Sequence, residues 1–152
     1  MPRADGWGPA VIVLHSDALL CAALAEPRSE WVITQIVHDD LAAPSHQPTW
    51  VLGALLALAG RGLLDDGELG EAFSAVLTLP QELHAPDAGL VGRARDLTAV
   101  MPFLDGLHVA LAERLDVPLV LTAAGRLGAA DEDGVRCQVL SPPAWLYPDH
   151  SD

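Results

Sequence analysis

Residues 103–115 read FLDGLHVALAERL, and residues 116–122, which read DVPLVLT, follow directly. The first segment carries leucines at helical spacing and predicts a helix that buries one leucine face, formed by Leu104, Leu107, Leu111 and Leu115. Pro102 stands just before it and suits a first helical turn. The apolar run 119–121 predicts a short strand. The stretch therefore predicts an α/β unit in which a helix leads into a buried strand.

Asp105 lies in the first turn of this predicted helix, where the helix dipole stabilises a carboxylate. Because the helix leads into a strand, Asp105 is expected at an edge of the sheet, and such edges hold most α/β active sites. His108 follows one turn later on the same helix face, which predicts an ordinary contact between Asp105 and His108. Asp105 is therefore the first candidate functional residue.

The composition describes an acidic, aliphatic chain of 152 residues, long enough for one domain with a core of its own. Eight Lys and Arg against 21 Asp and Glu give a formal net charge of −13. This balance argues against a broad phosphate-binding surface, because nucleic-acid affinity is built largely from Lys and Arg contacts. A local basic groove would still form if these five arginines cluster in space: Arg61, Arg93, Arg95, Arg114 and Arg126.

Cys21 and Cys137 lack metal-binding spacing and are predicted to be buried thiols in a reducing compartment. Residues 1–9 are short, polar and contain Gly and Pro, unlike a signal peptide. We find no apolar run near the roughly 20 residues that span a bilayer. The sequence predicts a cytoplasmic protein that does not contact the membrane.

The rest of the chain alternates short apolar runs with helical patterns. Strands are predicted at 10–14, 41–43, 80–84, 119–121 and 135–140, and helices at 15–25, 29–37, 44–58, 65–79, 86–99 and 103–115, with a strand as the alternative at 29–37. The first helix has Ser16 or Asp17 as its cap, and the helix that opens at Asp65 is expected to turn Leu69, Phe73, Val76 and Leu77 inward. We predict a flexible arm over 1–9, one α/β domain over 10–140 and a Pro-rich tail over 141–152.

The run Asp105-Gly-Leu-His, followed by Pro118-Leu-Val, Thr122 and Gly125-Arg-Leu, resembles the third and fourth signature segments of PIN domains, and within them the VapC-like toxins. Those proteins are metal-dependent ribonucleases. The resemblance implies a three-layer α/β domain, with a small central parallel sheet between helices. It also implies about four acidic residues that bind Mg²⁺ or Mn²⁺ at the strand ends.

Laid on the family pattern, this chain keeps one of the four acidic positions, Asp105. The first aspartate falls on His15, the glutamate on Trp50 and the last aspartate on Ala124. Asp17 takes the place of a small hydroxyl or amide residue. Because Mg²⁺ requires several oxygen ligands, the resemblance implies that family-type nuclease activity is severely reduced or absent.

Two interpretations of these residues stay open. In one, His15, Asp17 and Asp105, with Asp39 or Asp40, form a rearranged centre of nitrogen and oxygen ligands for Mn²⁺ or Zn²⁺. In the other, Asp17 caps a helix and His15 is a hydrogen-bonded polar residue at a strand end.

Two functions follow from these interpretations. The first is a degenerate family member that acts through protein contacts, as a homodimer or with an antitoxin-like partner, and needs no cofactor. The second is a toxin-type endoribonuclease that cuts single-stranded RNA with Mg²⁺ or Mn²⁺ on Asp105. Trp145 and Tyr147 of the tail are candidate anchors on a partner, or fold back on the domain itself.

Overall fold

The computed structural model describes residues 10–122 and 134–143. Within these ranges, five strands form one parallel sheet in the order β3-β2-β1-β4-β5. The strands are β1 (Val11–Leu14), β2 (Asp40–Pro44), β3 (Glu82–His84), β4 (Leu119–Val120) and β5 (Val139–Leu140). In the central strand, Ile12 lies opposite Leu41 and Val13 lies opposite Leu119. A purely parallel sheet needs cover on both faces.

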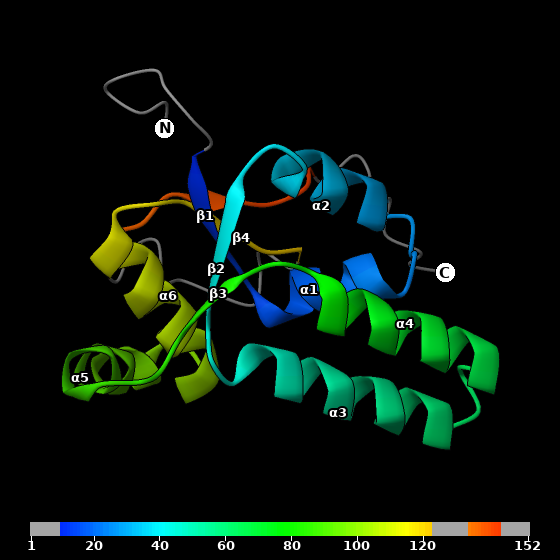
Figure 1. Ribbon diagram of the computed structural model, residues 1–152. Coiled ribbons are helices and arrows are strands. Elements are labelled where there is room, and N and C mark those ends of the chain that lie inside the picture. The colour runs from blue at the N-terminus through cyan, green and yellow to red at the C-terminus, as the bar shows by residue number, and fades with distance from the viewer. Residues whose placement is uncertain (1–9, 123–133, 144–152) are drawn as a thin grey trace, which may run out of the picture.

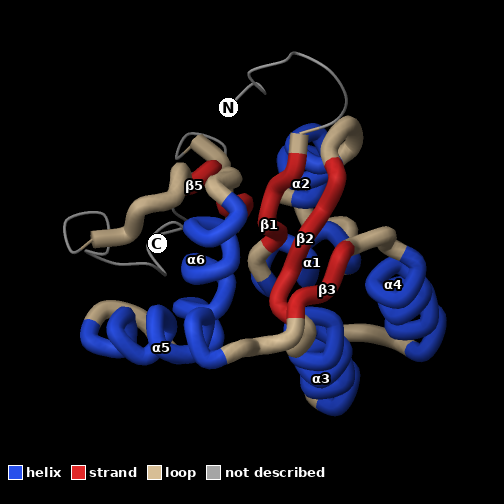
Figure 2. The backbone as a smooth tube through the Cα atoms, turned by 60° about the vertical axis from the view of Figure 1, so that its left-hand side comes forward, coloured by secondary structure: helices blue, strands red, loops and turns tan. Residues whose placement is uncertain are grey.

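Helices supply that cover. They are α1 (Ser16–Ala23), α2 (Ser29–Ile36), α3 (Gln47–Gly60), α4 (Asp66–Thr78), α5 (Ala88–Asp96), the 3₁₀ turn η1 (Leu97–Ala99) and α6 (Phe103–Leu115). Figures 1 and 2 show α5 and α6 on one side of the sheet and the other four helices on the opposite side. The predicted three-layer α/β fold with a central parallel sheet is therefore confirmed.

Alternate residues of the central strand enter two separate cores, as a strand with period-two side chains requires. Val13 packs with Leu111 and the other apolar side chains of the α5–α6 layer. Ile12 and Leu14 face the other way and pack with Leu55 and the rest of the α1–α4 layer. The continuous apolar run at the start of the domain is thus explained by burial on both faces.

Several predicted boundaries are wrong. The strand predicted at 135–140 covers only Val139–Leu140, and the helix predicted from Pro44 begins at Gln47 because Pro44 still belongs to β2. The segment predicted as one helix over 86–99 is α5 followed by η1. The predicted arm at 1–9 and most of the tail lie outside the described residues.

Two leucines predicted to face inward are exposed. Leu77 is 68% exposed, because the buried face of α4 runs through Ala72 and Val76. Leu104 is 40% exposed at the first turn of α6, whereas Leu107 and Leu111 are buried. The apolar face of each helix is therefore narrower than its leucine content suggests.

Cys21 is buried, and burial, more than nearby charges, raises the pKa of its thiol to about 12. Cys137 is only half-buried, so the prediction that both thiols are buried is wrong for Cys137. Neither Cys21 nor Cys137 forms a disulfide bond. None of the helices over 10–122 and 134–143 combines the length and apolar character of a membrane span.

The helices α5 and α6 approach closely at Gly106. A Cβ atom built there would lie 3.1 Å from the carbonyl oxygen and 3.2 Å from the Cα atom of Ala94. Because the obstacle is backbone, Gly106→Ala is expected to separate the helices and destabilise the fold by about 1–3 kcal/mol in urea unfolding, despite the better helix propensity of alanine.

The matched control is Gly53→Ala in α3, where an added Cβ meets nothing within 4 Å. This change is expected to stabilise the protein by about 0.5–1 kcal/mol through helix propensity alone. Stabilisation by both substitutions would contradict the close approach of α5 and α6.

Candidate functional site

His15 connects the end of β1 to the start of α1. It has extended backbone angles, and its imidazole Nδ1 accepts a hydrogen bond from the backbone N–H of Asp17 at 3.1 Å. His15 is therefore the N-cap of α1, and the prediction of Ser16 or Asp17 as the cap is wrong. A strand that ends directly at a helix leaves its last extended residue in the capping position.

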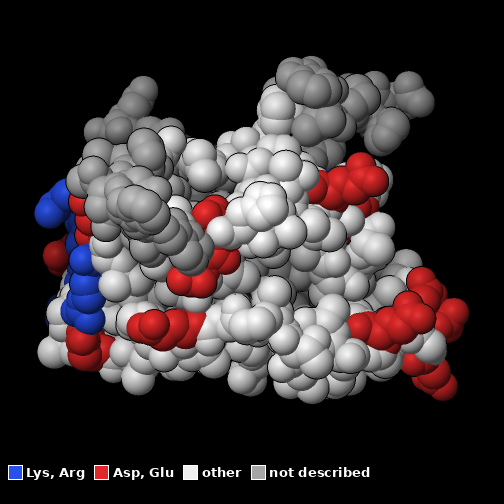
Figure 3. Space-filling model, turned by 45° about the horizontal axis from the view of Figure 1, so that its top comes forward, with Lys and Arg blue, Asp and Glu red and all other residues white. Residues whose placement is uncertain are grey.

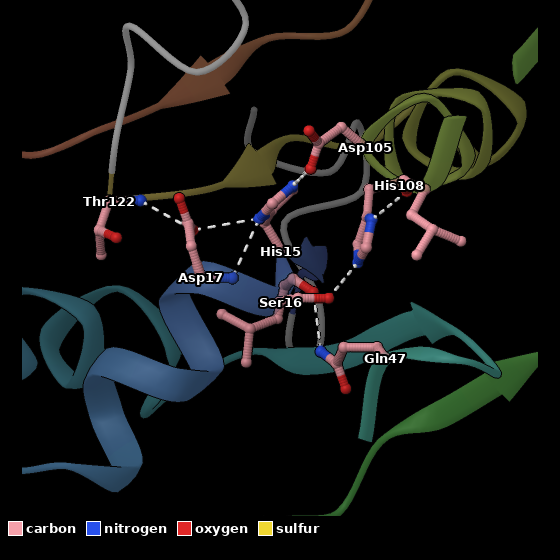
Figure 4. A network of polar contacts seen from close by, with 9 residues as sticks. His15, Ser16, Asp17, Gln47, Asp105, His108 and Thr122 are labelled. Atoms are coloured by element: carbon pink, nitrogen blue, oxygen red, sulfur yellow. Dashed lines mark hydrogen bonds and ion pairs between the residues drawn. The ribbon is translucent and has the colours of Figure 1, made fainter. Parts of the chain in front are cut away.

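The His15 ring lies between two buried carboxylates from different elements (Figure 4). Its Nε2 is 2.7 Å from Asp105 Oδ1 on α6, and its Nδ1 is 3.2 Å from Asp17 Oδ1 on α1. Burial by itself lowers the pKa of His15, but the hydrogen bonds and charges of Asp105 and Asp17 outweigh it, so that the pKa is raised.

Two arrangements of protons satisfy this geometry. With a neutral ring, Nε2–H donates to Asp105 while Nδ1 accepts from the Asp17 backbone. With a charged ring, Nδ1–H turns to the Asp17 carboxylate. The raised pKa favours the charged ring in this position, because two carboxylates stabilise an imidazolium.

Asp17 ties α1 to the neighbouring strand. Its Oδ1 accepts a hydrogen bond from the backbone N–H of Thr122 at 3.1 Å, just beyond β4. The carboxylate therefore holds the carboxyl ends of two adjacent strands together through the start of α1.

His108 and Ser16 form a second polar pair beside His15. The His108 Nδ1–H donates to the carbonyl oxygen of Leu104 at 2.8 Å, so its Nε2 accepts from the Ser16 hydroxyl at 3.1 Å. The rings of His15 and His108 have centroids 4.4 Å apart, and His46 meets His108 edge to face at 5.1 Å.

The sequence predicts a contact between Asp105 and His108, and the described hydrogen bonds join each of the two residues to other groups. Asp105 bonds His15, whereas the two ring nitrogens of His108 are taken by Leu104 and Ser16. The carboxylate thus joins α6 to the end of β1, a contact that helical spacing within α6 does not predict.

Gln47 is a structural residue of this site that sequence analysis missed. Its side chain is fully buried, and its Nε2 donates to the carbonyl oxygen of Leu14 at 2.8 Å. It also exchanges amide hydrogen bonds with Gln81 at 2.8 and 3.0 Å. The start of α3 is thereby fixed to β1 and to the segment before β3. A glutamine at the start of an apolar helix is too common a pattern to single out.

A pocket of about 200 Å³ opens beside these groups. Its lining includes His15, His46, Trp50, Asp105 and His108. Burial foremost, with a smaller effect of nearby His15, lowers the pKa of His46, and Asp105 opposes this. Trp50 is a lining residue of the same pocket as Asp105.

The possible metal donors of this site are one imidazole and two carboxylates. Among residues 10–122 and 134–143, no group of three or more His, Cys, Asp or Glu is arranged to hold a metal ion. Mg²⁺ and Mn²⁺ prefer several oxygen ligands, whereas here an imidazole bonds both carboxylates. The described donors therefore do not fit a divalent-cation centre.

The structure separates other candidates from this site. Asp40 begins β2 opposite Val11, at the far end of the sheet from His15, so the inclusion of Asp39 or Asp40 in a rearranged centre is wrong. Ala124, Trp145 and Tyr147 lie outside the described residues.

Two arginines of the described residues, Arg93 and Arg114, form ion pairs with acidic side chains. Arg93 makes two hydrogen bonds to Glu113, at 3.0 and 3.1 Å, and Arg114 pairs with Asp87 at 2.5 and 2.7 Å. On the face seen in Figure 3, acidic side chains are spread widely, whereas basic ones lie along one edge. These ion pairs therefore give no support to the local basic groove that the sequence analysis allowed.

Together, the three layers, the all-parallel sheet and the polar cluster at the carboxyl ends of β1 and β4 define a PIN-like α/β domain. No family model matches the chain. Ribonuclease VapC12 of Mycobacterium tuberculosis, from strains H37Rv and CDC 1551, is 33% identical over 131 residues, which cover 86% of this chain and all of that protein. The chain belongs to the VapC family of PIN-domain proteins.

Solved structures confirm the fold at lower sequence identity. The M. tuberculosis toxin VapC20, described as cleaving the sarcin-ricin loop, superposes with a TM-score of 0.57 at 16% identity, over 78% of this chain and 94% of its own. VapBC2 of Rickettsia felis, crystallised with a promoter DNA fragment, gives 0.55 at 13% identity, over 88% and 99% of the two chains.

Proposed function

We propose that this protein is a VapC-family domain with a degenerate acidic site, which acts through protein contacts rather than metal-dependent RNA cleavage. The observation that carries the proposal is His15, whose two ring nitrogens meet the carboxylates of Asp17 and Asp105. An imidazolium in this place balances buried negative charge that a cation would otherwise balance. The domain then retains its fold without a metal or another cofactor.

The partners under this proposal are a second copy of the chain or an antitoxin-like protein. Support for an antitoxin-like partner comes from the likeness to VapBC2, a structure of a toxin-antitoxin pair. The formal charge of −13 argues against RNA as a partner, because the polyanion would be repelled.

The second candidate function is a toxin-type endoribonuclease that cuts single-stranded RNA. One observation favours it: the 33% identity to a protein named as a ribonuclease, over the whole length of that relative. In this case Mg²⁺ or Mn²⁺ would bind Asp105, with Asp17 and His15 displaced from their present contacts.

Metal-dependent unfolding separates the two functions. A ligand that binds only the folded state stabilises it by about 2.7 kcal/mol at a hundred times its Kd. We expect no rise in Tm with millimolar Mn²⁺ or Mg²⁺, and no cleavage of single-stranded RNA. A metal-dependent rise together with RNA cleavage that Asp105→Asn abolishes would overturn the proposal.

The matched variant restores two of the family's three replaced acidic residues with His15→Asp and Trp50→Glu. It removes the imidazole from between Asp17 and Asp105 and opens the wall of the pocket to a carboxylate. We expect Mn²⁺ to raise the Tm of this double variant but not that of the wild type. An equal response of both proteins would show that His15 and Trp50 do not decide metal binding.

A further inference from the structure

A larger groove lies at the opposite end of the sheet from the His15 pocket. Its lining includes Val11 and Asp40, the first residues of β1 and β2, whereas His15 follows the last residue of β1. The groove has a volume of about 980 Å³ and shares no lining residue with the His15 pocket. We name it the amino-end groove.

Apolar side chains form much of the amino-end groove. Ile33 and Val37, one helical turn apart near the end of α2, are 48% and 59% exposed. Leu115 and Val117 contribute from the end of α6 and the loop after it. Exposed apolar side chains that gather around a hollow, rather than standing singly, are typical of a binding surface.

The charges around this groove are acidic. Asp39, Asp40 and Glu82 line it, and neither lysine nor arginine occurs among its described lining residues. The Glu82 carboxylate lies 2.9 Å from His84 Nε2, and Asp39 and Asp40 are adjacent in sequence, so the lining carries three acidic groups. The potential of the groove therefore favours a cationic ligand.

We propose that the amino-end groove binds a basic amphipathic segment of a partner protein. Aliphatic side chains of the segment would cover Ile33 and Val37, while its lysines or arginines face Asp39 and Asp40. A second copy of this chain fits poorly, because it carries the same net charge of −13. The inference rests on the proposed function, since it names the surface and the chemistry of those protein contacts.

The test is fluorescence anisotropy of the full chain with a labelled synthetic peptide that carries leucine and lysine on opposite helix faces. The same peptide with glutamate in place of lysine is the ligand control. We expect the basic peptide to bind and Asp39→Asn/Asp40→Asn to weaken it about tenfold. Val37→Ser is expected to weaken binding through lost apolar contact.

The matched protein control is Asp66→Asn/Glu71→Gln, which removes the same charge from exposed positions of α4. It is expected to change the affinity less than about twofold, since screening limits distant charges. Equal weakening by both double variants would show unspecific attraction and overturn the proposal. Tighter peptide binding by Trp7→Ala would also overturn it, because the chain's own first residues would then be the occupant.

This test is independent of the metal experiment. If the peptide binds the groove and the protein also cleaves RNA in a metal-dependent way, the proposed function is contradicted but the groove remains a binding site. If the groove variants do not change peptide binding and metal ions do not change the Tm, only the groove proposal is contradicted.

Discussion

Replacing His15 with alanine is expected to lower the free energy of unfolding by about 3–5 kcal/mol, because it leaves two buried carboxylates without the imidazole between them. Asp105 and Asp17 are 5% and 8% exposed, so water replaces the lost contacts poorly. The same change removes the N-cap residue of α1, and from the neutral ring it also removes the hydrogen bond that Nδ1 accepts from the Asp17 N–H, worth about 1 kcal/mol. Urea unfolding at neutral pH measures the total cost.

The control is His38→Ala, since His38 lies on an exposed turn and its loss is expected to cost less than about 0.5 kcal/mol. His15→Gln tests the charge, because glutamine retains a donor and an acceptor but does not titrate. A cost no larger than that of His38→Ala would contradict the role given to His15.

The pH dependence of this difference has a defined sign. The pKa of His15 is raised in the folded protein, so the stability that it contributes is present below the ordinary value of 6.5 and is lost as the pH rises through the raised value. The advantage of the wild type over His15→Gln should therefore shrink as the pH rises above about 6.5. An advantage that grows over this range would show that the neutral ring is the stabilising form.

Replacing Gln47 with alanine is expected to cost about 2–4 kcal/mol. The substitution deprives the Leu14 carbonyl and the Gln81 amide of the hydrogen bonds from Gln47, and it leaves a void at a fully buried position. Equilibrium unfolding in urea is the measurement, with the exposed Gln138→Ala as a control that should cost less than about 0.5 kcal/mol.

Gln47→Met separates the two parts of this cost, because methionine fills a similar volume without polar atoms. If the hydrogen bonds matter most, the methionine variant is nearly as unstable as the alanine variant. Full recovery of stability in Gln47→Met would assign the cost to packing and contradict the hydrogen-bonding role.

Local patterns in the sequence were sufficient for the order and type of most elements. The helix predicted at 103–115 has the observed bounds, and the predicted opening at Asp65 is a capping box with Glu68. These features depend on residues within a few positions of one another, so a linear pattern records them. The width of a helix's buried face depends on the elements that pack against it, which can be distant in sequence. For this reason Leu77 and Leu104, which were predicted to face inward, are exposed in the structure.

The candidate site likewise combines features that the sequence predicts with features that only the tertiary structure sets. The sequence by itself determined which residue types stand at the family's acidic positions, and it placed His15 and Asp105 at strand and helix ends that share one edge of the sheet. Only the tertiary structure decided their partners: His15 bonds Asp105 across 90 positions of sequence, and Ser16 bonds His108 across 92. Such contacts depend on the relative placement of α1 and α6 against the sheet, which is set by packing of both cores and leaves no trace in local spacing.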